Sequence, residues 1–226
     1  MSSKRSCAAL FFDAPMVSFG VDSKFDRRDT LTFPSRSVVT GFVAAAMGIR
    51  RDDRAGLAEL ADLDVISVVF LNSPGRIEAD YHTVGGGYDR ARTEFIPAKA
   101  DGKPRGTVQT WRYFISDGCS AAVVSGDPAL IDRVATALRD PVWGGWIGRK
   151  CCIPATPVFQ GVFPSEEDAL GKLRALTEKR GGPRSLQLFR ECALTDPEAA
   201  LYPDVPLDFA DRLFAPRAVK EERHGG

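Results

Sequence analysis

The residues of this sequence best suited to acid–base chemistry are Asp80, Tyr81 and His82. Metal-free RNA cleavage needs a base, an acid and a cation beside the phosphate; His82, Tyr81 and a nearby lysine or arginine have suitable side chains. A histidine next to a tyrosine at a strand end is more often a packing or hydrogen-bonding residue, and we favour that interpretation. The sequence has no HExxH, GxSxG or Walker A motif. We therefore expect no catalytic residue, no metal site and no cofactor.

A second group of residues is suited to holding RNA. Between residues 140 and 166 the only charged residues are Arg149 and Lys150, which closely follow Trp146 and several glycines. Glycines let a backbone approach a phosphate, the paired cations would neutralise it, and an indole can stack on an unpaired base. The alternative is a bulged edge strand whose tryptophans fill the core. We prefer the core role for Trp143 and the stacking role for Trp146.

The predicted strand that contains Trp111 and Arg112 supplies another candidate. Neighbours in a strand point to opposite faces. If Trp111 packs inward, Arg112 faces outward, where a guanidinium can pair with a phosphate and stack on a base. A salt bridge to a neighbouring strand explains Arg112 equally well.

The composition is that of an ordinary globular protein, with 226 residues, 44% of them hydrophobic and 27% charged. Thirty Lys and Arg residues balance thirty Asp and Glu residues. This balance argues against tight nonspecific binding of nucleic acid by the chain alone, but it permits a local basic groove within a larger assembly.

The cysteines and the amino-terminal segment bear on the cellular compartment. The five cysteines form no C-x-x-C pair, which suits small buried thiols in a reducing cytoplasm. The apolar run at residues 7–12 is too short for a signal-peptide core or a membrane span. We therefore expect a cytoplasmic protein without membrane contact.

Hydrophobic periodicity predicts the elements that must position these residues. We expect strands at 7–12, 65–71, 111–115 and 121–124, and helices opening at 33–35 and 127–128 with a short one at 57–63. Residues 14–31 are expected to form a long loop. The order strand, helix, strand, strand, helix, strand predicts an α+β, ferredoxin-like (RRM-like) βαββαβ body. A glycine-rich and charged arm, about 72–108, is inserted between its second and third strands.

Two domains are predicted. Residues 1–165 form the ferredoxin-like body with its arm. Residues 166–226 form a small carboxy-terminal subdomain with a helix at 166–179, a strand at 186–189 and another short strand within 204–219. The tail from residue 220 is expected to be disordered.

Six short motifs together resemble the CasD family, the RAMP-type subunit of type I-E Cascade in CRISPR antiviral defence. Each motif is short, but all occur in the family's order across residues 8–165. They are APM (14–16), FPSRS (33–37), GIRRDD (48–53), DYHTV (80–84), QTWR (109–112) and IGRKC (147–151).

The resemblance implies a non-catalytic RNA-binding subunit of a ribonucleoprotein complex. It would hold the 5′ handle of CRISPR RNA, cap the backbone filament, contact the Cascade backbone subunit and large subunit, and meet target DNA only indirectly. The arm would be a thumb that reaches the adjacent backbone subunit. By matching position, the implied RNA contacts are Arg112 and Trp146, supported by Arg149 and Lys150, with Arg36, Gln109, Tyr81 and His82 as further candidates.

The resemblance also leaves an enzymatic alternative open. A related subunit of type I-C systems processes precursor CRISPR RNA itself, so His82 with Tyr81 could form a metal-free endoribonuclease site. His82 has neither a second histidine nor a lysine near it in the sequence as a companion, which favours the binding role.

Overall fold

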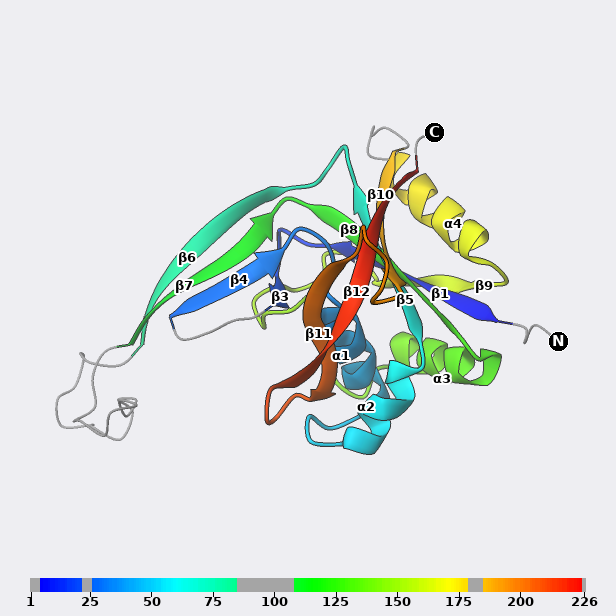
Figure 1. Cartoon of the computed structure of the whole chain (residues 1–226), viewed down its shortest axis with the longest axis horizontal. Helices are drawn as coiled ribbons and strands as arrows, with labels where there is room; N and C mark the ends of the chain where they lie inside the picture. Colours follow the sequence, from blue (N-terminus) through cyan, green and yellow to red (C-terminus); the bar gives the residue numbers. More distant parts are fainter. Residues whose placement is uncertain (1–4, 22–25, 85–107, 179–184, 225–226) are drawn as a thin grey trace.

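The chain forms two β-sheets, and helices cover both faces of the larger one (Figure 1). The structure is a computed structural model that describes residues 5–21, 26–84, 108–178 and 185–224. Within these residues the elements are β1 (Ser6–Asp13), β2 (Met16–Val17), β3 (Phe19–Val21), β4 (Arg27–Leu31), α1 (Arg36–Met47), α2 (Arg54–Ala61), β5 (Asp64–Phe70), β6 (Arg76–Val84), β7 (Val108–Ser116), β8 (Cys119–Gly126), α3 (Pro128–Arg139), β9 (Phe159–Phe163), α4 (Glu166–Glu178), β10 (Leu186–Cys192), β11 (Ala200–Asp208) and β12 (Leu213–His224).

The larger sheet has seven antiparallel strands in the order β11-β12-β10-β5-β8-β1-β9. Its strand β1 is buried on both faces, which explains why its apolar run does not alternate with polar residues. Leu10 and Phe12 pack into the core beneath α1, α2 and α3, whereas Ala9 and Phe11 pack into the core beneath α4. The predicted α+β class is confirmed, whereas the ferredoxin-like order of the body remains a prediction.

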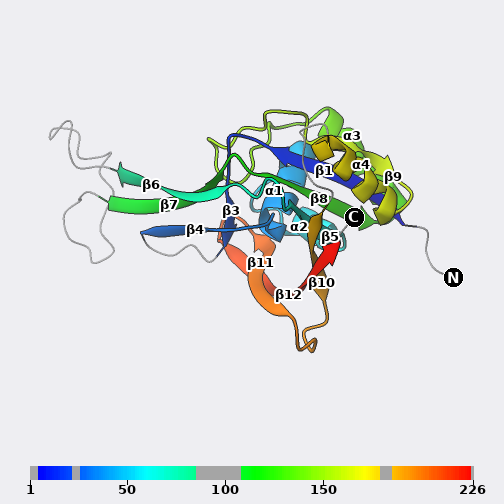
Figure 2. The same ribbon diagram turned by 90° about the horizontal axis from the view of Figure 1, so that it is seen from above.

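The smaller sheet is built around β7. Strand β6 pairs with β7 along its whole length, from Arg76 opposite Ser116 to Val84 opposite Val108. The other edge of β7 takes β2 at one end and the parallel strand β4 further along. Strands β4, β6 and β7 extend away from the larger sheet in both views (Figures 1 and 2). Residues 85–107 of the predicted arm lie outside the described residues.

The prediction of a long loop at residues 14–31 is wrong, because this segment contributes β2, β3 and β4. These strands have two, three and five residues, too few for a period of two to be visible in the sequence. Their pairing comes from the tertiary structure: β3 pairs with β4, and β4 pairs with β7. The result is a wall of short strands beside α1, in which β3 contacts the helix.

The predicted helix boundaries are confirmed at α1 and α3. Ser35 is the N-cap of α1, and Gly48 ends that helix in the left-handed conformation, with its N–H directed to the carbonyls of Ala44 and Ala45. Asp127 caps α3, its carboxylate accepting from the next backbone N–H groups, and Pro128 occupies the first helical position.

The carboxy-terminal region departs from its prediction. In place of one short strand, two long strands, β11 and β12, form an antiparallel pair. The tail is paired with β10 as far as His224, opposite Leu186, so the expected disorder is wrong for residues 220–224. Because β10 also pairs with β5, these strands extend the larger sheet. The domain boundary at residue 165 remains a prediction.

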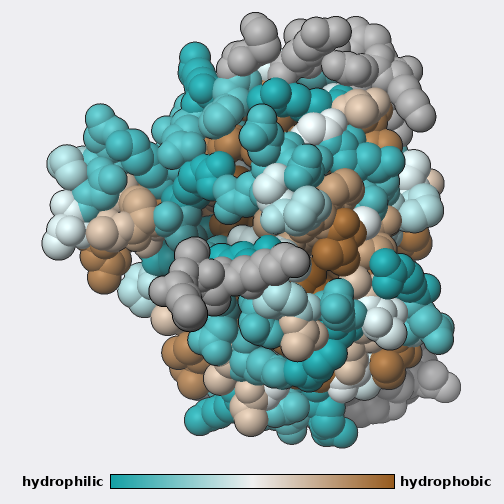
Figure 3. Space-filling view, turned by 90° about the vertical axis from the view of Figure 1, so that its right-hand side faces the viewer, coloured by the Kyte–Doolittle hydropathy of each residue, from teal (hydrophilic) through white to brown (hydrophobic). Residues whose placement is uncertain are grey.

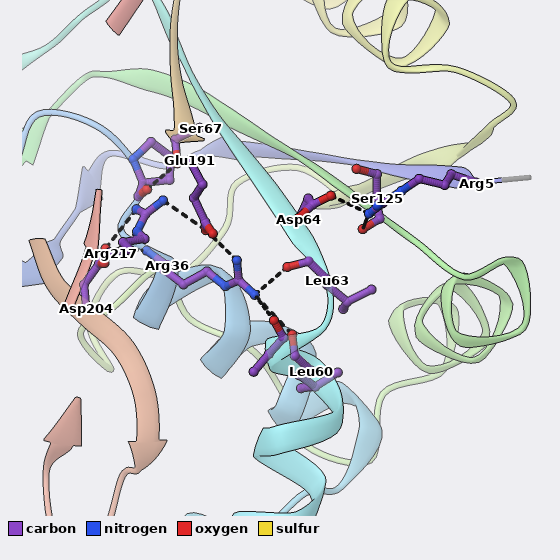
Figure 4. A network of polar contacts seen from close by, with 12 residues as sticks. Arg5, Arg36, Leu60, Leu63, Asp64, Ser67, Ser125, Glu191, Asp204 and Arg217 are labelled. Atoms are coloured by element: carbon purple, nitrogen blue, oxygen red, sulfur yellow. Dashed lines mark hydrogen bonds and ion pairs between the residues drawn. The ribbon is translucent and has the colours of Figure 1, made fainter. Parts of the chain in front are cut away.

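Buried ion pairs fasten these carboxy-terminal strands to α1 (Figure 4). Arg217 and Asp204, with side chains 4% and 1% exposed, form a two-point pair with N···O distances of 2.7 and 3.0 Å. The carboxylate of Asp204 also accepts from the backbone N–H of Arg36 at 2.7 Å. Glu191 accepts from the guanidinium groups of both Arg36 and Arg217. The first turn of α1 is thereby joined to β10, β11 and β12.

The structure removes Arg36 from the candidate RNA contacts. Its side chain is 2% exposed, and one guanidinium nitrogen donates to the carbonyls of Leu60, Ala61 and Leu63 at the end of α2 (Figure 4). A cation at this position satisfies carbonyl groups that the helix leaves unpaired. Arg36 therefore serves the fold, and the prediction that it binds RNA is wrong.

Candidate nucleic-acid interface

An open cleft of about 1460 Å³ lies along α1. Its walls come from several parts of the chain: β3 and β4, one side of α1, residues 49–52 and 143–150, and the turn between β11 and β12. Arg112 of β7 is also part of the lining. The cleft thus lies where both sheets and the carboxy-terminal turn meet.

The lining of the cleft is strongly cationic, although the chain has no net charge. Seven lysine and arginine side chains line it, against two carboxylates. Such an excess in a concave surface attracts phosphate groups. The cations are Arg28, Arg50, Arg51, Arg112, Arg149, Lys150 and Arg212, and the carboxylates are Asp29 and Asp52.

Aromatic side chains lie among these cations. Trp143 and Trp146 are 46% and 42% exposed, and both line the cleft with Phe42, Phe209 and Phe214. The prediction that Trp143 fills the core is therefore wrong. The Nζ atom of Lys150 is 5.8 Å from the centroid of the Trp146 ring, so a cation accompanies this exposed indole. Aromatic faces beside cations are typical of surfaces that bind single-stranded nucleic acid.

The segment that carries both tryptophans is held in place by backbone hydrogen bonds. The N–H groups of Val142 and Trp143 donate to carbonyls in the last turn of α1. Ile147 is fully buried, and its carbonyl accepts from the N–H of Ser18 at 3.1 Å. Residues 144–146 are thus held by backbone hydrogen bonds on one side and by buried Ile147 on the other, and the indole of Trp146 lies at the surface.

Two glycines of this segment permit close packing of the backbone. Gly148 has a φ of +87°, and a β-carbon there would lie 1.8 Å from the carbonyl oxygen of Ser18. A β-carbon at Gly145 would lie 2.4 Å from the ring of Phe42. Gly144 is exposed with no atom within 4 Å of that position, so the predicted approach of phosphate to a glycine backbone remains a prediction there.

Arg149 and Arg112 join the cleft to the strands of the arm. The Nη2 atom of Arg149 lies 2.7 Å from Oδ2 of Asp80 on β6, and Nη1 donates to the carbonyl of Arg112 on β7 at 3.4 Å. The guanidinium also lies 5.9 Å from the ring centroid of Phe114. The Nε atom of Arg112 donates to Oγ1 of Thr110 at 3.1 Å.

The remaining predicted residues lie on the arm, outside the lining of the cleft. Tyr81 and Trp111 form a cross-strand pair with ring centroids 5.3 Å apart, and they are 53% and 41% exposed. Inward packing of Trp111 was the condition under which Arg112 would face outward, and the exposure of Trp111 does not meet that condition. Gln109 is exposed on the same strand. His82 lies on the opposite face of β6 from Tyr81, with Nε2 3.7 Å from Oδ2 of Asp80.

The structure adds cleft residues that sequence reasoning did not select. Arg28 comes from the segment expected to be a loop, Arg212 from the unexpected turn between β11 and β12, and Phe214 from the start of β12. Arg50 and Arg51 belong to the GIRRDD motif, and this pair of cations was the available signal. Within the described ranges, no group of three or more His, Cys, Asp or Glu side chains is placed to hold a metal ion.

Comparison with known proteins establishes the family. A family model described as CRISPR-associated protein (Cas_Cas5) matches residues 7–222. The chain belongs to this family. The CRISPR system Cascade subunit CasD of Escherichia coli (strain K12) is 29% identical to this Cas5-family chain over 173 residues, which cover 72% of this chain and 74% of that protein. The resemblance predicted from the six motifs is confirmed.

Solved structures show the same architecture as this Cas5-family chain. A chain of a "CRISPR RNA-guided surveillance complex" has a TM-score of 0.74 and 26% identity, covering 96% of this chain and 89% of that chain. A "Crystal structure of Cas protein" has a TM-score of 0.66 and 27% identity, with coverage of 96% and 94%. Among the described residues, none of the four helices has the length and apolar character that a bilayer span requires.

The end of the molecule away from the arm differs from the cleft. The space-filling view of that end shows mainly hydrophilic side chains, interrupted by smaller hydrophobic areas (Figure 3). Arg133 on α3, which does not line the cleft, is paired with Glu59 of α2. Charges paired in this way form a solvated surface and provide useful control positions.

Proposed function

We propose that this chain is a non-catalytic subunit of a Cascade-type surveillance complex and that it holds the 5′ handle of CRISPR RNA in the cleft. The observation that carries the proposal is the cleft itself, in which seven cations and exposed indoles converge in a chain of zero net charge. The names of the relatives, a Cascade subunit and an RNA-guided surveillance complex, support this assignment.

Unpaired ribonucleotides fit the two kinds of side chain in the cleft. In this proposal Trp146 stacks on a base, and Arg112 and Lys150 pair with phosphates on either side of it. Arg149 supports them from the base of the arm. Binding by stacking and phosphate contacts requires no reacting group, so a different subunit would cut the precursor.

The fold supports the rest of the assignment. The order β5-β8-β1-β9, with α1 and α3 on one face, is the order expected of a ferredoxin-like body. The β6–β7 hairpin would be the thumb that reaches the adjacent backbone subunit, while the body caps the filament and contacts the large subunit. Target DNA would be met only through the assembled complex, in the cytoplasm.

The proposal is tested by removing the two predicted contacts one at a time. We expect Arg112→Ala and Trp146→Ala each to weaken binding of a handle RNA by about 1–3 kcal/mol, the usual scale for one charge-assisted or stacked contact. Filter binding at fixed salt, together with co-purification of the assembled complex, measures this loss. Arg133→Ala is the matched control, because its partner is Glu59 and it lies outside the cleft. If Arg112→Ala and Trp146→Ala bind like the control, the cleft is not the RNA site.

The endoribonuclease alternative is weakened by the geometry of β6. Tyr81 and His82 are consecutive residues of this strand, so their side chains point to opposite faces and cannot act together on one phosphate. Tyr81 packs against Trp111, whereas His82 lies near Asp80. Incubation of the protein with a labelled repeat hairpin in EDTA would reverse this conclusion if it produced site-specific cleavage that His82→Ala abolished.

A further inference from the structure

Asp80 occupies a central position among the charged groups at the base of the arm. Its Oδ2 atom lies 2.7 Å from Nη2 of Arg149 and 3.7 Å from Nε2 of His82. Asp80 is also the cross-strand partner of Arg112. Its side chain is 35% exposed, and it is not one of the described residues that line the cleft. The carboxylate therefore pairs with a cation of the lining without lining the cleft itself.

Arg149 is held by groups from both strands of the arm. Asp80 belongs to β6, whereas the Arg112 carbonyl and the Phe114 ring belong to β7. The side chain is only 18% exposed. A guanidinium with these contacts has little freedom to follow a phosphate, but it connects the segment that bears Trp146 to the base of the hairpin.

We propose that Asp80 is a positioning residue for RNA binding: through Arg149, it fixes the Trp146–Lys150 side of the cleft against the arm. This inference rests on the proposed function of the cleft and assigns a role to a carboxylate that would otherwise oppose the binding of an anion. Arg149 then acts as a strut between the cleft and the arm, and Arg112 and Lys150 supply the phosphate contacts.

Two physical effects of Asp80 on RNA affinity have opposite signs, so a binding measurement can distinguish them. A carboxylate near a cationic cleft lowers its positive potential, so electrostatics alone predicts that Asp80→Asn binds RNA more tightly, by up to a few fold. Loss of positioning predicts weaker binding, because the Trp146 segment and the arm are no longer held in one geometry.

The first measurement compares Asp80→Asn with Glu78→Gln. Glu78 lies two residues away on the same face of β6, and its carboxylate accepts from Ser116 Oγ. It forms no ion pair with any residue that the structure describes, so this control removes the same charge without freeing a cation among them. The probe is a synthetic RNA with the 5′-handle sequence of the host repeat. We expect Asp80→Asn to weaken binding about tenfold, Glu78→Gln to change it by less than about twofold, and Asp80→Glu to recover most of the loss.

A second measurement separates the strut from a phosphate ligand. A cation that neutralises a phosphate contributes about 0.7 to the slope of log affinity against log salt for a single strand. We expect Lys150→Gln to reduce this slope by about that amount, and Arg149→Gln to leave it unchanged while weakening binding about as much as Asp80→Asn. The double variant Asp80→Asn/Arg149→Gln should be no weaker than either single variant.

Each outcome has a definite meaning. Thermal unfolding of every variant shows whether a loss of binding reflects a loss of folding, and Asp80→Glu retains the carboxylate if Asp80→Asn is unstable. Asp80→Asn that binds as tightly as wild type, or more tightly, overturns the positioning role and leaves the cleft assignment intact. A reduced salt slope in Arg149→Gln overturns the strut. Wild-type protein that does not bind the handle overturns the proposed function and this inference with it.

Discussion

The replacement Asp204→Asn tests how the carboxy-terminal strands are attached to the wall of the cleft. Asp204 receives hydrogen bonds from the backbone of Arg36 and from two nitrogens of Arg217, and its side chain is 1% exposed. Asparagine keeps one acceptor oxygen but presents an NH₂ group to donors. The variant therefore loses both the charge and part of the hydrogen bonding.

The expected loss in the free energy of unfolding follows from the charges of the ion-paired side chains around Asp204. The charges of the two cations and two carboxylates, Arg36, Arg217, Asp204 and Glu191, sum to zero. Removal of the Asp204 carboxylate therefore leaves an uncompensated cation in a buried site. Breaking a buried pair in this way costs about 3–5 kcal/mol, a large part of the 5–15 kcal/mol that stabilises a typical domain. We expect the free energy of unfolding to fall by this amount in urea denaturation.

Two further variants make the result interpretable. Asp211→Asn removes a carboxylate that pairs with Arg54 on the surface, where both side chains are about two-thirds exposed, and it should cost less than about 1 kcal/mol. Arg217→Met/Asp204→Leu removes both members of the buried pair, keeps the sum at zero, and should be more stable than Asp204→Asn alone. An Asp204→Asn variant no less stable than Asp211→Asn would refute the attachment described here.

Two other predictions concern the segment beside the cleft. Gly148→Ala should lower the free energy of unfolding by at least about 2 kcal/mol, because Gly148 has a φ of +87° and a β-carbon there would collide with the carbonyl of Ser18. Gly144→Ala is the control and should change the free energy of unfolding little, because a β-carbon there meets no neighbouring atom. Urea denaturation of both variants checks this prediction. Burial raises the pKa of the Cys152 thiol from 9.0 to about 11, so iodoacetamide at pH 8 should label exposed Cys151 and leave Cys152 unmodified in the native protein, as peptide mass mapping would show. Labelling of Cys152 at pH 8 would contradict its burial. Above pH 9 the thiol of Cys152 loses its proton in the unfolded chain before it does in the folded chain. The contribution of Cys152 to the free energy of unfolding should therefore fall as the pH rises towards 11.

The parts of the fold that local rules govern could be predicted from the sequence. The caps at Ser35 and Asp127 and the glycine that ends α1 act within a few residues of each other, so their patterns are visible in the chain. The long, doubly buried run of β1 is equally visible. Trp146 and Lys150 could be selected together because they are four residues apart and lie in the same loop.

The rest depends on contacts between distant residues. The backbone N–H of Arg36 donates a hydrogen bond to Asp204, 168 positions away, and the Arg36 side chain is buried. Because such distant contacts are not visible in the local sequence, the arginine of the FPSRS motif was predicted to bind RNA. Strands β3 and β4 are too short to have a recognisable period, so Arg28 could not be placed beside Arg112. The turn that brings Phe214 to the cleft forms because β11 and β12 pair, and no local pattern in the sequence predicts this pairing.

The most direct test of the cleft as the RNA site is cross-linking mapped to residues. A handle RNA with 4-thiouridine at single positions would be irradiated in the assembled complex, and the linked peptides of this chain identified by mass spectrometry. We predict links to residues 143–150 and to the strand that carries Arg112, with the strongest at Trp146. Links confined to α3 or α4, with none along the cleft, would contradict the proposed site.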